Sequence, residues 1–391
     1  MLTLLKSVFF ILTVLSAIVL YYYKVELTDF NAQDMSLPDP PVLDGVYKEN
    51  NLLVGGDWLL KGRIHGPESL LIEGNIIYTG TGDGKIVKLT TDGQILQEIK
   101  VNPAAKDCTT SKSFYECGRP LGIRRLNEKE VIVADASKGI YAVNFESNSI
   151  RMIFSADTKV NGKKPRFIDD LTIFDDGKTA YVTDVSTKYG FEDMVKVVME
   201  HQPFGRVIKV NLETGEATEE TTGYYFPNGI QRHPDGDSFV VCDYMSANVW
   251  RYYVKGKKKG ESKLFIDNLP GLPDNIRLSR NGDTFLLGLG SKRSQENPHF
   301  FDKLNNGFIA RHVRGIMASL LTIEQMVKLD SIQSHPGSLF LELDLDGNVI
   351  KSYHDPTGKT VQEVTEIAED DKYFYIGSFS RDYLLRVPKR K

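Results

Sequence analysis

Three oxygen-bearing side chains recur at one fixed distance before a turn glycine. The offset is eight residues in each case, for Asp169 before Gly177, Asn228 before Gly236 and Asp274 before Gly282. Carboxylate and amide oxygens, without sulfur or imidazole, suit a hard cation, and calcium accepts irregular sets of about six to eight oxygens. The set therefore predicts a calcium site. The alternative is that each Asp or Asn only caps the turn before its strand.

A repeating strand unit must position these residues. Each copy has a short apolar strand, a turn, a second strand rich in Val, Ile, Tyr or Phe, and a third strand with its own turn. The copies begin near Leu70, Gly122, Leu171, Gly229, Asn275 and Glu366. Their central turns are mostly about fifty residues apart, which matches a four-stranded propeller blade. The sequence therefore predicts an all-β fold, a six-bladed β-propeller.

The repeat places the oxygen-bearing residues on the innermost strand of each blade. Eight is an even offset, so in an extended strand each residue shares a face with its turn, and equivalent positions ring the central axis. Less regular copies supply Glu68, Leu121 and Thr365 to the same ring. Converging buried carboxylates would be costly without a counter-ion, which favours the metal interpretation.

Two segments with helical character interrupt this pattern, at about 191–204 in the third copy and 301–329 in the fifth. In a propeller such insertions lie on one face, where they cover a pocket, meet a membrane or are decorative loops. The propeller domain is expected over residues 61–391.

The amino-terminal end departs from the soluble average of the chain. Residues 7–23 read SVFFILTVLSAIVLYYY, close to the ~17–25 apolar residues that a membrane-spanning helix needs. A cleaved signal peptide is the alternative, but the run is long for one and lacks a clean A-x-A cleavage site. We predict a cytosolic tail (1–6), a transmembrane signal anchor (7–23) and a stalk (24–60). The propeller of this single-pass type II protein would be lumenal or extracellular, at the plasma membrane or the endoplasmic reticulum.

The cysteines and the net charge narrow the compartment and the partners. Cys108 and Cys117 enclose a polar loop, TTSKSFYE, whose spacing suits a loop-closing disulfide in an oxidising compartment. Cys242 lies in the apolar run SFVVCDY and is expected to be a buried free thiol. The formal net charge of −4 provides no basic surface for nucleic acid.

Several motifs in order carry a family resemblance. GPES, CGRPLGIRR, FIDDLTIFDDGKTAYVTDVS, FPNGIQRHPDG and LPDNIRLSRNGDTFLLGL together resemble the strictosidine synthase-like family, most closely its animal branch, in which a signal anchor precedes a propeller. The resemblance covers nearly the whole chain after the stalk. It implies a calcium-dependent six-bladed propeller related to paraoxonase, gluconolactonase and diisopropyl-fluorophosphatase.

The resemblance also implies a ligand set. In those relatives a glutamate, asparagines and an acidic pair bind a catalytic calcium at the axis. Matching the motifs residue by residue, the implied metal ligands are Glu68, Asp169, Asn228, Asp274 and Asn275. Asp169-Asp170 stands where relatives commonly have Asn-Asp, and the extra carboxylate is expected to make the site more anionic.

Catalytic residues match less well than metal ligands. Leu121 occupies the position of a paraoxonase histidine that assists hydrolysis, and Thr365, with Glu366 adjacent, occupies that of the strictosidine synthase glutamate. Condensation chemistry of that kind is therefore not expected. We expect calcium-dependent hydrolysis of a small ester or lactone, of arylesterase type, with Asp169 as the catalytic carboxylate. The alternative is a non-enzymatic binding or scaffold propeller with a structural calcium.

Overall fold

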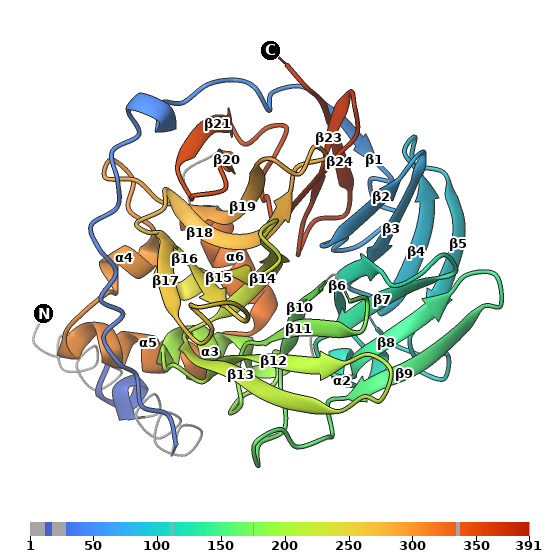
Figure 1. The fold of residues 1–391 in the computed structure, drawn as a ribbon. Coiled ribbons are helices and arrows are strands. Elements are labelled where there is room, and N and C mark those ends of the chain that lie inside the picture. The colour runs from blue at the N-terminus through green and yellow to red at the C-terminus, as the bar shows by residue number, and fades with distance from the viewer. Residues whose placement is uncertain are drawn as a thin grey trace, which may run out of the picture.

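Six four-stranded antiparallel sheets surround a central axis (Figure 1) in this computed structural model, which describes residues 12–17, 29–108, 110, 113–174, 176–333 and 337–390. The all-β, six-bladed propeller is confirmed. The first blade consists of β2 (Leu70–Glu73), β3 (Ile76–Gly80), β4 (Lys85–Thr90) and β5 (Ile95–Lys100). The second consists of β6 (Pro120–Arg125), β7 (Glu130–Asp135), β8 (Gly139–Asn144) and β9 (Ser149–Ser155). The third consists of β10 (Ile168–Ile173), β11 (Thr179–Asp184), β12 (Gly205–Asn211) and β13 (Ala217–Tyr224).

The last three blades follow the same order from the axis outward, except that the sixth is completed from the other end of the chain. They are β14 (Pro227–Arg232), β15 (Ser238–Asp243), β16 (Asn248–Tyr253), β17 (Ser262–Ile266); β18 (Gly271–Leu278), β19 (Phe285–Lys292), β20 (Ser338–Leu343), β21 (Val349–Asp355); and β22 (Glu366–Glu369), β23 (Tyr373–Gly377), β24 (Leu384–Pro388) with β1 (Asp57–Leu59).

Burial explains why the inner strands read as continuous apolar runs. β15, with the sequence SFVVCD, is buried at every residue because neighbouring blades cover both of its faces. The outermost strand β9 has only one buried residue, Phe154, and the rest of it is exposed or half-buried. Cys242 lies in β15 as a buried free thiol, as expected.

The sixth blade closes the ring with a strand from the amino-terminal side. β1 pairs antiparallel with β24, so that Asp57 lies opposite Arg386 and Leu59 opposite Leu384. This pairing covers the outer edge of β24 and closes the ring by backbone hydrogen bonds between segments from opposite sides of the propeller sequence. The propeller therefore begins at Asp57 and not at residue 61, because a three-residue strand is too short to give a periodic signal.

The segment expected to be a stalk, 24–60, lies along the propeller where it is described, from Asp29 onward. The Gln33 amide donates to Glu200 O at 2.9 Å and the Met35 amide to Asn305 O at 2.9 Å. Met35 and Leu37 are buried. The segment is therefore not a free stalk where it is described; it has little apolar periodicity in the sequence, and its contacts are long-range.

The predicted anchor lies largely outside the described residues. Of the tail (1–6) and the anchor (7–23), the structure describes only residues 12–17, which are helical and exposed. Among all described residues, no helix combines the length and apolar character needed to cross a bilayer.

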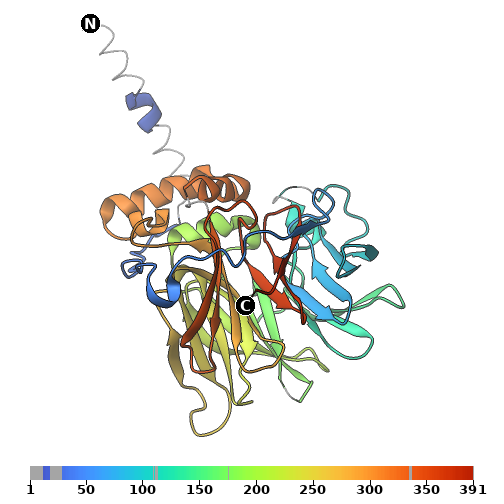
Figure 2. The same ribbon diagram turned by 90° about the horizontal axis from the view of Figure 1, so that it is seen from above.

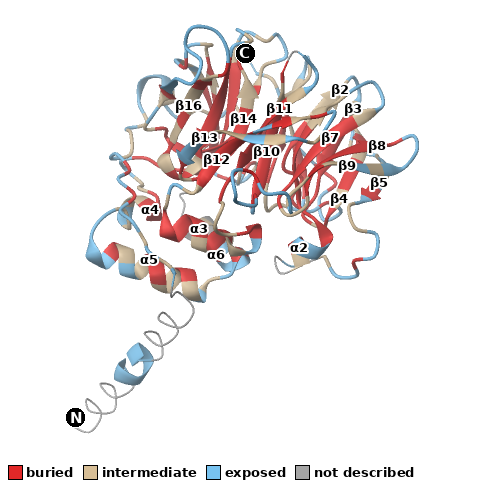
Figure 3. Ribbon diagram, turned by 60° about the horizontal axis from the view of Figure 1, so that its bottom comes forward, coloured by how far each residue is buried: buried red, intermediate tan, exposed pale blue. Residues whose placement is uncertain are grey.

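Helices gather on one face of the propeller (Figure 2). They come from the two segments that interrupt blades three and five: η3 (Phe191–Asp193), α3 (Met194–Glu200), α4 (Phe300–Lys303), α5 (Phe308–Leu320) and α6 (Ile323–Gln333). Their apolar side chains form one buried cluster with residues at the ends of the inner strands, such as Phe167 and Phe226. Figure 3 shows this pattern as red on α3 and the strands beside it, with red, tan and pale blue alternating along α5.

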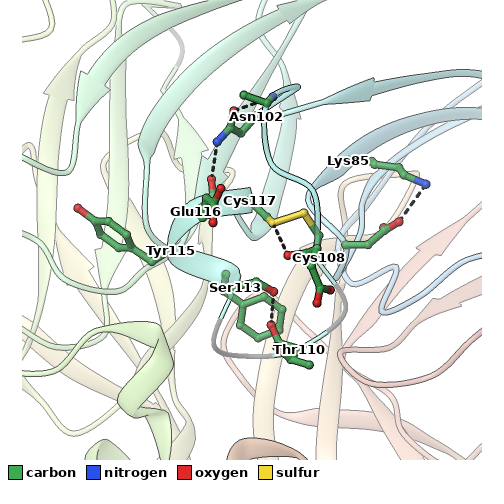
Figure 4. The surroundings of a disulfide bond; sticks show 12 residues. Lys85, Asn102, Cys108, Thr110, Ser113, Tyr115, Glu116 and Cys117 are labelled. Carbon is green, nitrogen blue, oxygen red and sulfur yellow. Dashed lines mark hydrogen bonds and ion pairs between the residues drawn. A yellow bond between two sulfur atoms is a disulfide. The ribbon is translucent and has the colours of Figure 1, made fainter.

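The predicted disulfide joins Cys108 and Cys117 (Figure 4). Cys117 ends the short helix α2 (Phe114–Cys117), and the Asn102 side-chain amide donates to Glu116 O at 3.0 Å. The ring of Phe114 contacts that of Phe191 with 4.9 Å between centroids. The crosslinked loop thereby joins blade two to the helical cluster.

Candidate metal centre and pocket

A cavity of about 610 Å³ lies between the helices and the end of the propeller axis. Four of the expected metal ligands line it: Glu68, Asp169, Asn228 and Asp274. They come from four different blades, since Glu68 precedes β2 while the others lie on β10, β14 and β18. All four are buried.

A repeated irregularity aims three of these side chains. In blades three, four and five, the pairing of the first strand with the second shifts register where the polar residue lies: between Ile168 and Leu171, between Pro227 and Ile230, and between Pro273 and Ile276. A β-bulge of this kind turns a side chain out of the regular alternation. The even offset of eight residues therefore locates the positions, but the bulges and not plain alternation set their direction.

Burial and mutual repulsion make the carboxyl groups of the cavity floor harder to ionise. Burial raises the pKa of Asp169 well above its usual value, and the neighbouring carboxylates of Glu68 and Asp170 raise it further. Burial, then Glu68 and Asp169, raise the pKa of Asp274 in the same way. Burial also raises the pKa of Glu68 to about 7, although the Arg119 guanidinium opposes this shift.

An orphaned amide oxygen completes the floor. Asn228 Oδ1 is buried and has no hydrogen-bond partner. An unpaired buried acceptor beside three buried carboxylates is the arrangement that a cation would satisfy. Oxygen donors alone fit calcium better than zinc or copper. Across the described residues, no three Asp, Glu, His or Cys side chains alone form a metal-holding group, so a bound ion would also need the Asn228 amide and water.

Asp170 differs from its neighbour Asp169. Its Oδ2 accepts hydrogen bonds from Arg124 Nη2 at 3.0 Å, Arg277 Nη1 at 2.8 Å and the Ile230 amide at 2.9 Å. Burial would raise the pKa of Asp170, but the two guanidiniums outweigh it and the pKa is lowered. Two internal cations thus neutralise Asp170, and the extra carboxylate that is expected to make the site more anionic is that of Asp169.

Asn275 and the sixth-blade residue Glu366 contact the same guanidinium, that of Arg277. Asn275 Oδ1 accepts from Arg277 Nη2 at 3.0 Å, and Arg277 Nη2 lies 2.6 Å from Glu366 Oε2. Neither Asn275, Thr365 nor Glu366 lines the cavity. The amide oxygen of Asn275 is thus engaged by a guanidinium, unlike that of Asn228.

The sequence did not indicate several polar residues of the site, among them Glu363 and Arg119, which both act on the Glu68 carboxyl. Glu363 lines the cavity from the loop between β21 and β22, and its Oε2 accepts from Ser378 Oγ and from the amide and hydroxyl of Ser380. Arg119 is buried and donates to Glu68 Oε2 at 3.3 Å and to Gly66 O at 3.0 Å. Neither lies in the strand periodicity; only the position of Arg119, two residues before Leu121, could have drawn attention.

The walls of the cavity are largely apolar. Leu121 lies where the ring register expected it and faces the cavity, so that position has no proton acceptor. The other apolar lining residues include Phe167, Phe191, Met194, Phe226, Phe300, Phe301, Met326 and Phe379. The site therefore presents a polar, anionic floor beneath walls that suit an apolar ligand.

Solved structures share the fold of this chain. A gluconolactonase from Xanthomonas campestris superposes with a TM-score of 0.55 at 13% identity, covering 92% of this chain and 97% of that one. The calcium-binding protein regucalcin from Agrobacterium tumefaciens gives a TM-score of 0.52 at 10% identity, covering 88% and 95%.

Sequence comparisons are more specific. The strictosidine synthase model matches residues 169–257, and the model for the amino-terminal part of strictosidine synthase-like proteins matches residues 45–89. The adipocyte plasma membrane-associated proteins of Gallus gallus and Rattus norvegicus are 36% and 35% identical to this chain; each alignment covers 91% of it, and 83% and 92% of the respective relative. The chain therefore belongs to the strictosidine synthase-like family, among relatives of the adipocyte plasma membrane-associated proteins.

Proposed function

We propose that the chain is a membrane-anchored, calcium-dependent hydrolase of esters or lactones, of arylesterase type. The observation that carries this proposal is the cavity floor, where buried carboxylates and the orphaned Asn228 oxygen converge beneath apolar walls. The gluconolactonase and regucalcin likenesses support the fold on which such a site is built.

Glu68, Asp169, Asn228 and Asp274 would hold the calcium. When bound, it would polarise the substrate carbonyl and stabilise the oxyanion. The aromatic and Met side chains of the walls hold the apolar part of the substrate and exclude bulk water. Asp169 lines the cavity. In this proposal it is the catalytic carboxylate, which would take the proton of an attacking water.

The membrane part of the proposal rests on the apolar run 7–23 and on the relatives, which are named as plasma membrane-associated proteins. We place residues 1–6 in the cytosol and the propeller in the lumen or outside the cell, as a single-pass type II protein. The Cys108–Cys117 disulfide agrees with an oxidising compartment.

One observation favours a second candidate, a binding or scaffold propeller in which calcium is structural. Leu121 faces the cavity from the ring position at which a proton-accepting side chain would assist hydrolysis. In that case the same ligands would stabilise the fold without turnover.

Hydrolysis assays separate the two candidates. We expect phenyl acetate or a simple lactone to be hydrolysed in calcium and not in chelator, and Asn228→Ala to lose most of this activity. Asn51→Ala, which alters an exposed side chain outside the cavity, is the matched control. Absence of turnover while calcium still raises the melting temperature would favour the binding propeller and exclude the hydrolase.

A further inference from the structure

Helix α5 carries apolar side chains on its outward face. Phe308, Ile309 and Leu320 are 69%, 77% and 53% exposed. Val313 and Ile316, which are half-buried, continue the line from Ile309 to Leu320 at spacings of four, three and four residues. Such spacing places them along one side of the helix. A helix on the surface of a soluble domain usually presents polar residues there.

The opposite face of α5 already accounts for its packing. Ala310, Arg314, Gly315 and Ala318 are buried. Arg314 Nη1 donates to Met199 O at 3.0 Å, which joins α5 to the end of α3. The packing of α5 therefore does not depend on the outward apolar residues, and the fold gives no reason for their exposure.

The course of the chain brings the expected membrane anchor close to this helix. Asp34 Oδ1 accepts from the Gly307 amide at 2.8 Å and from Arg311 Nη1 at 2.7 Å, at the start of α5. Lys188 Nζ donates to Asp29 O at 2.5 Å, so the segment is also held at Asp29. Between residue 23 and Asp29 the chain can span about 20 Å at most, at ~3.6 Å per residue.

We propose that α5 docks into the surface of the bilayer that holds the anchor, with Phe308, Ile309 and Leu320 among the lipid headgroups and upper acyl chains. The proposal rests on the membrane anchoring proposed above. The short segment between residue 23 and Asp29 keeps α5 near the bilayer. An outward apolar stripe on an otherwise packed helix suits a position at the membrane interface. A second copy of the chain is the competing occupant.

Docking has a consequence for the cavity. α4 and α6 lie immediately before and after α5, and both line it, through Phe300, Phe301 and Met326. A docked α5 sets the helical wall of the cavity against the lipid. Substrate would then enter from the bilayer, which selects esters or lactones that partition into lipid over freely soluble ones.

Site-directed labelling of the full-length chain tests the docking. Leu320→Cys and Ile350→Cys, 53% and 51% exposed in the native chain, form a matched pair, and Ile350 lies beside the β20–β21 turn, at the end of blade five remote from the helices. Native cysteines do not interfere, because Cys108 and Cys117 are crosslinked and Cys242 is buried. Each variant is labelled with a nitrobenzoxadiazole probe and reconstituted into phosphatidylcholine vesicles with and without doxyl-labelled lipid.

We expect the label at residue 320 to shift its emission to the blue and to be quenched by doxyl lipid, and the label at 350 to do neither. If the protein floats with the vesicles but the labels at 320 and 350 are quenched equally by doxyl lipid, the docking is overturned and the anchor is left intact. A blue shift at 320 without lipid quenching would overturn it in favour of a second copy. Failure of the chain to float with the vesicles would overturn the anchor and the docking together.

A double substitution on the stripe tests the consequence. Ile309→Asp with Leu320→Asp changes only exposed side chains. We expect hydrolysis of an ester dissolved in the vesicles to fall several-fold, while hydrolysis of water-soluble phenyl acetate stays unchanged. Unchanged hydrolysis of the lipid-dissolved ester would overturn the docking, whereas absence of hydrolysis of both esters by the unsubstituted chain would overturn the hydrolase alone.

Discussion

Asp169 and Asp170 are adjacent in the chain and buried side by side, yet their electrostatic surroundings are opposite. Asp169 faces the cavity among other carboxylates, and its pKa is raised. Asp170 faces two guanidiniums, and its pKa is lowered. The pair marks two layers along the propeller axis, which we call the open layer (Glu68, Asp169, Asn228, Asp274) and the paired layer (Arg124, Asp170, Arg277, Glu366).

The difference shows where the protein supplies its own cations. In the paired layer, Arg277 contacts both Asp170 and Glu366, at 2.8 and 2.6 Å, although burial still raises the pKa of Glu366 to about 7. Among the described residues, the open layer has an ion pair between Arg119 and Glu68, at 3.3 Å, whereas Asp169 and Asp274 lie among other carboxylates that raise their pKa. Buried carboxylates without cations are costly, so the open layer is where an external cation would bind.

The largest expected effect comes from replacing each of the two adjacent aspartates, Asp169 and Asp170, by asparagine. Asp170→Asn should destabilise the fold by about 3–5 kcal/mol, because it leaves buried guanidiniums without their carboxylate. Asp169→Asn, its matched control, should raise stability in calcium-free buffer, because it removes charge from a set of repelling anions. Urea unfolding of both variants measures the contrast, and similar losses in the two would erase the distinction between the layers.

A second prediction concerns calcium. At 100-fold excess over its dissociation constant, calcium should stabilise the native chain by about 2.7 kcal/mol. Asp274→Asn should abolish most of this gain, since it removes a carboxylate of the open layer, whereas Glu366→Gln in the paired layer should retain it. Thermal unfolding with calcium and with chelator measures the difference. Loss of the gain in both variants would place the ion elsewhere or between the layers.

The smallest expected effect is at the contact between the layers. Thr183 Oγ1 donates to Asn228 O at 2.8 Å and accepts from the Asp170 amide at 2.9 Å. Thr183→Val preserves the shape and removes both bonds, which should cost about 1–2 kcal/mol. Ser147→Ala, on an exposed turn, is the control. A stability loss no larger than in the control would show that the layers are independent.

Local sequence patterns predicted the six blades, because strand periodicity and turn residues are short-range signals. They also located Asp169, Asn228 and Asp274, since the distance from bulge to turn repeats. They could not separate Asp169 from Asp170, or Asn228 from Asn275, because that difference depends on Arg124 and Arg277 from other blades. β1 and Glu363 were missed for a related reason: a short strand and an irregular loop acquire their roles only through contacts distant in sequence.

We propose that the open layer binds calcium and that the paired layer does not. Isothermal titration of calcium into the full-length chain in detergent tests it most directly. We expect one site in the native chain, an affinity at least about tenfold weaker in Asn228→Ala, which is about 1.4 kcal/mol, and an unchanged affinity in Glu366→Gln. Equal affinities in the native chain and Asn228→Ala, or no binding heat in either, would contradict the claim.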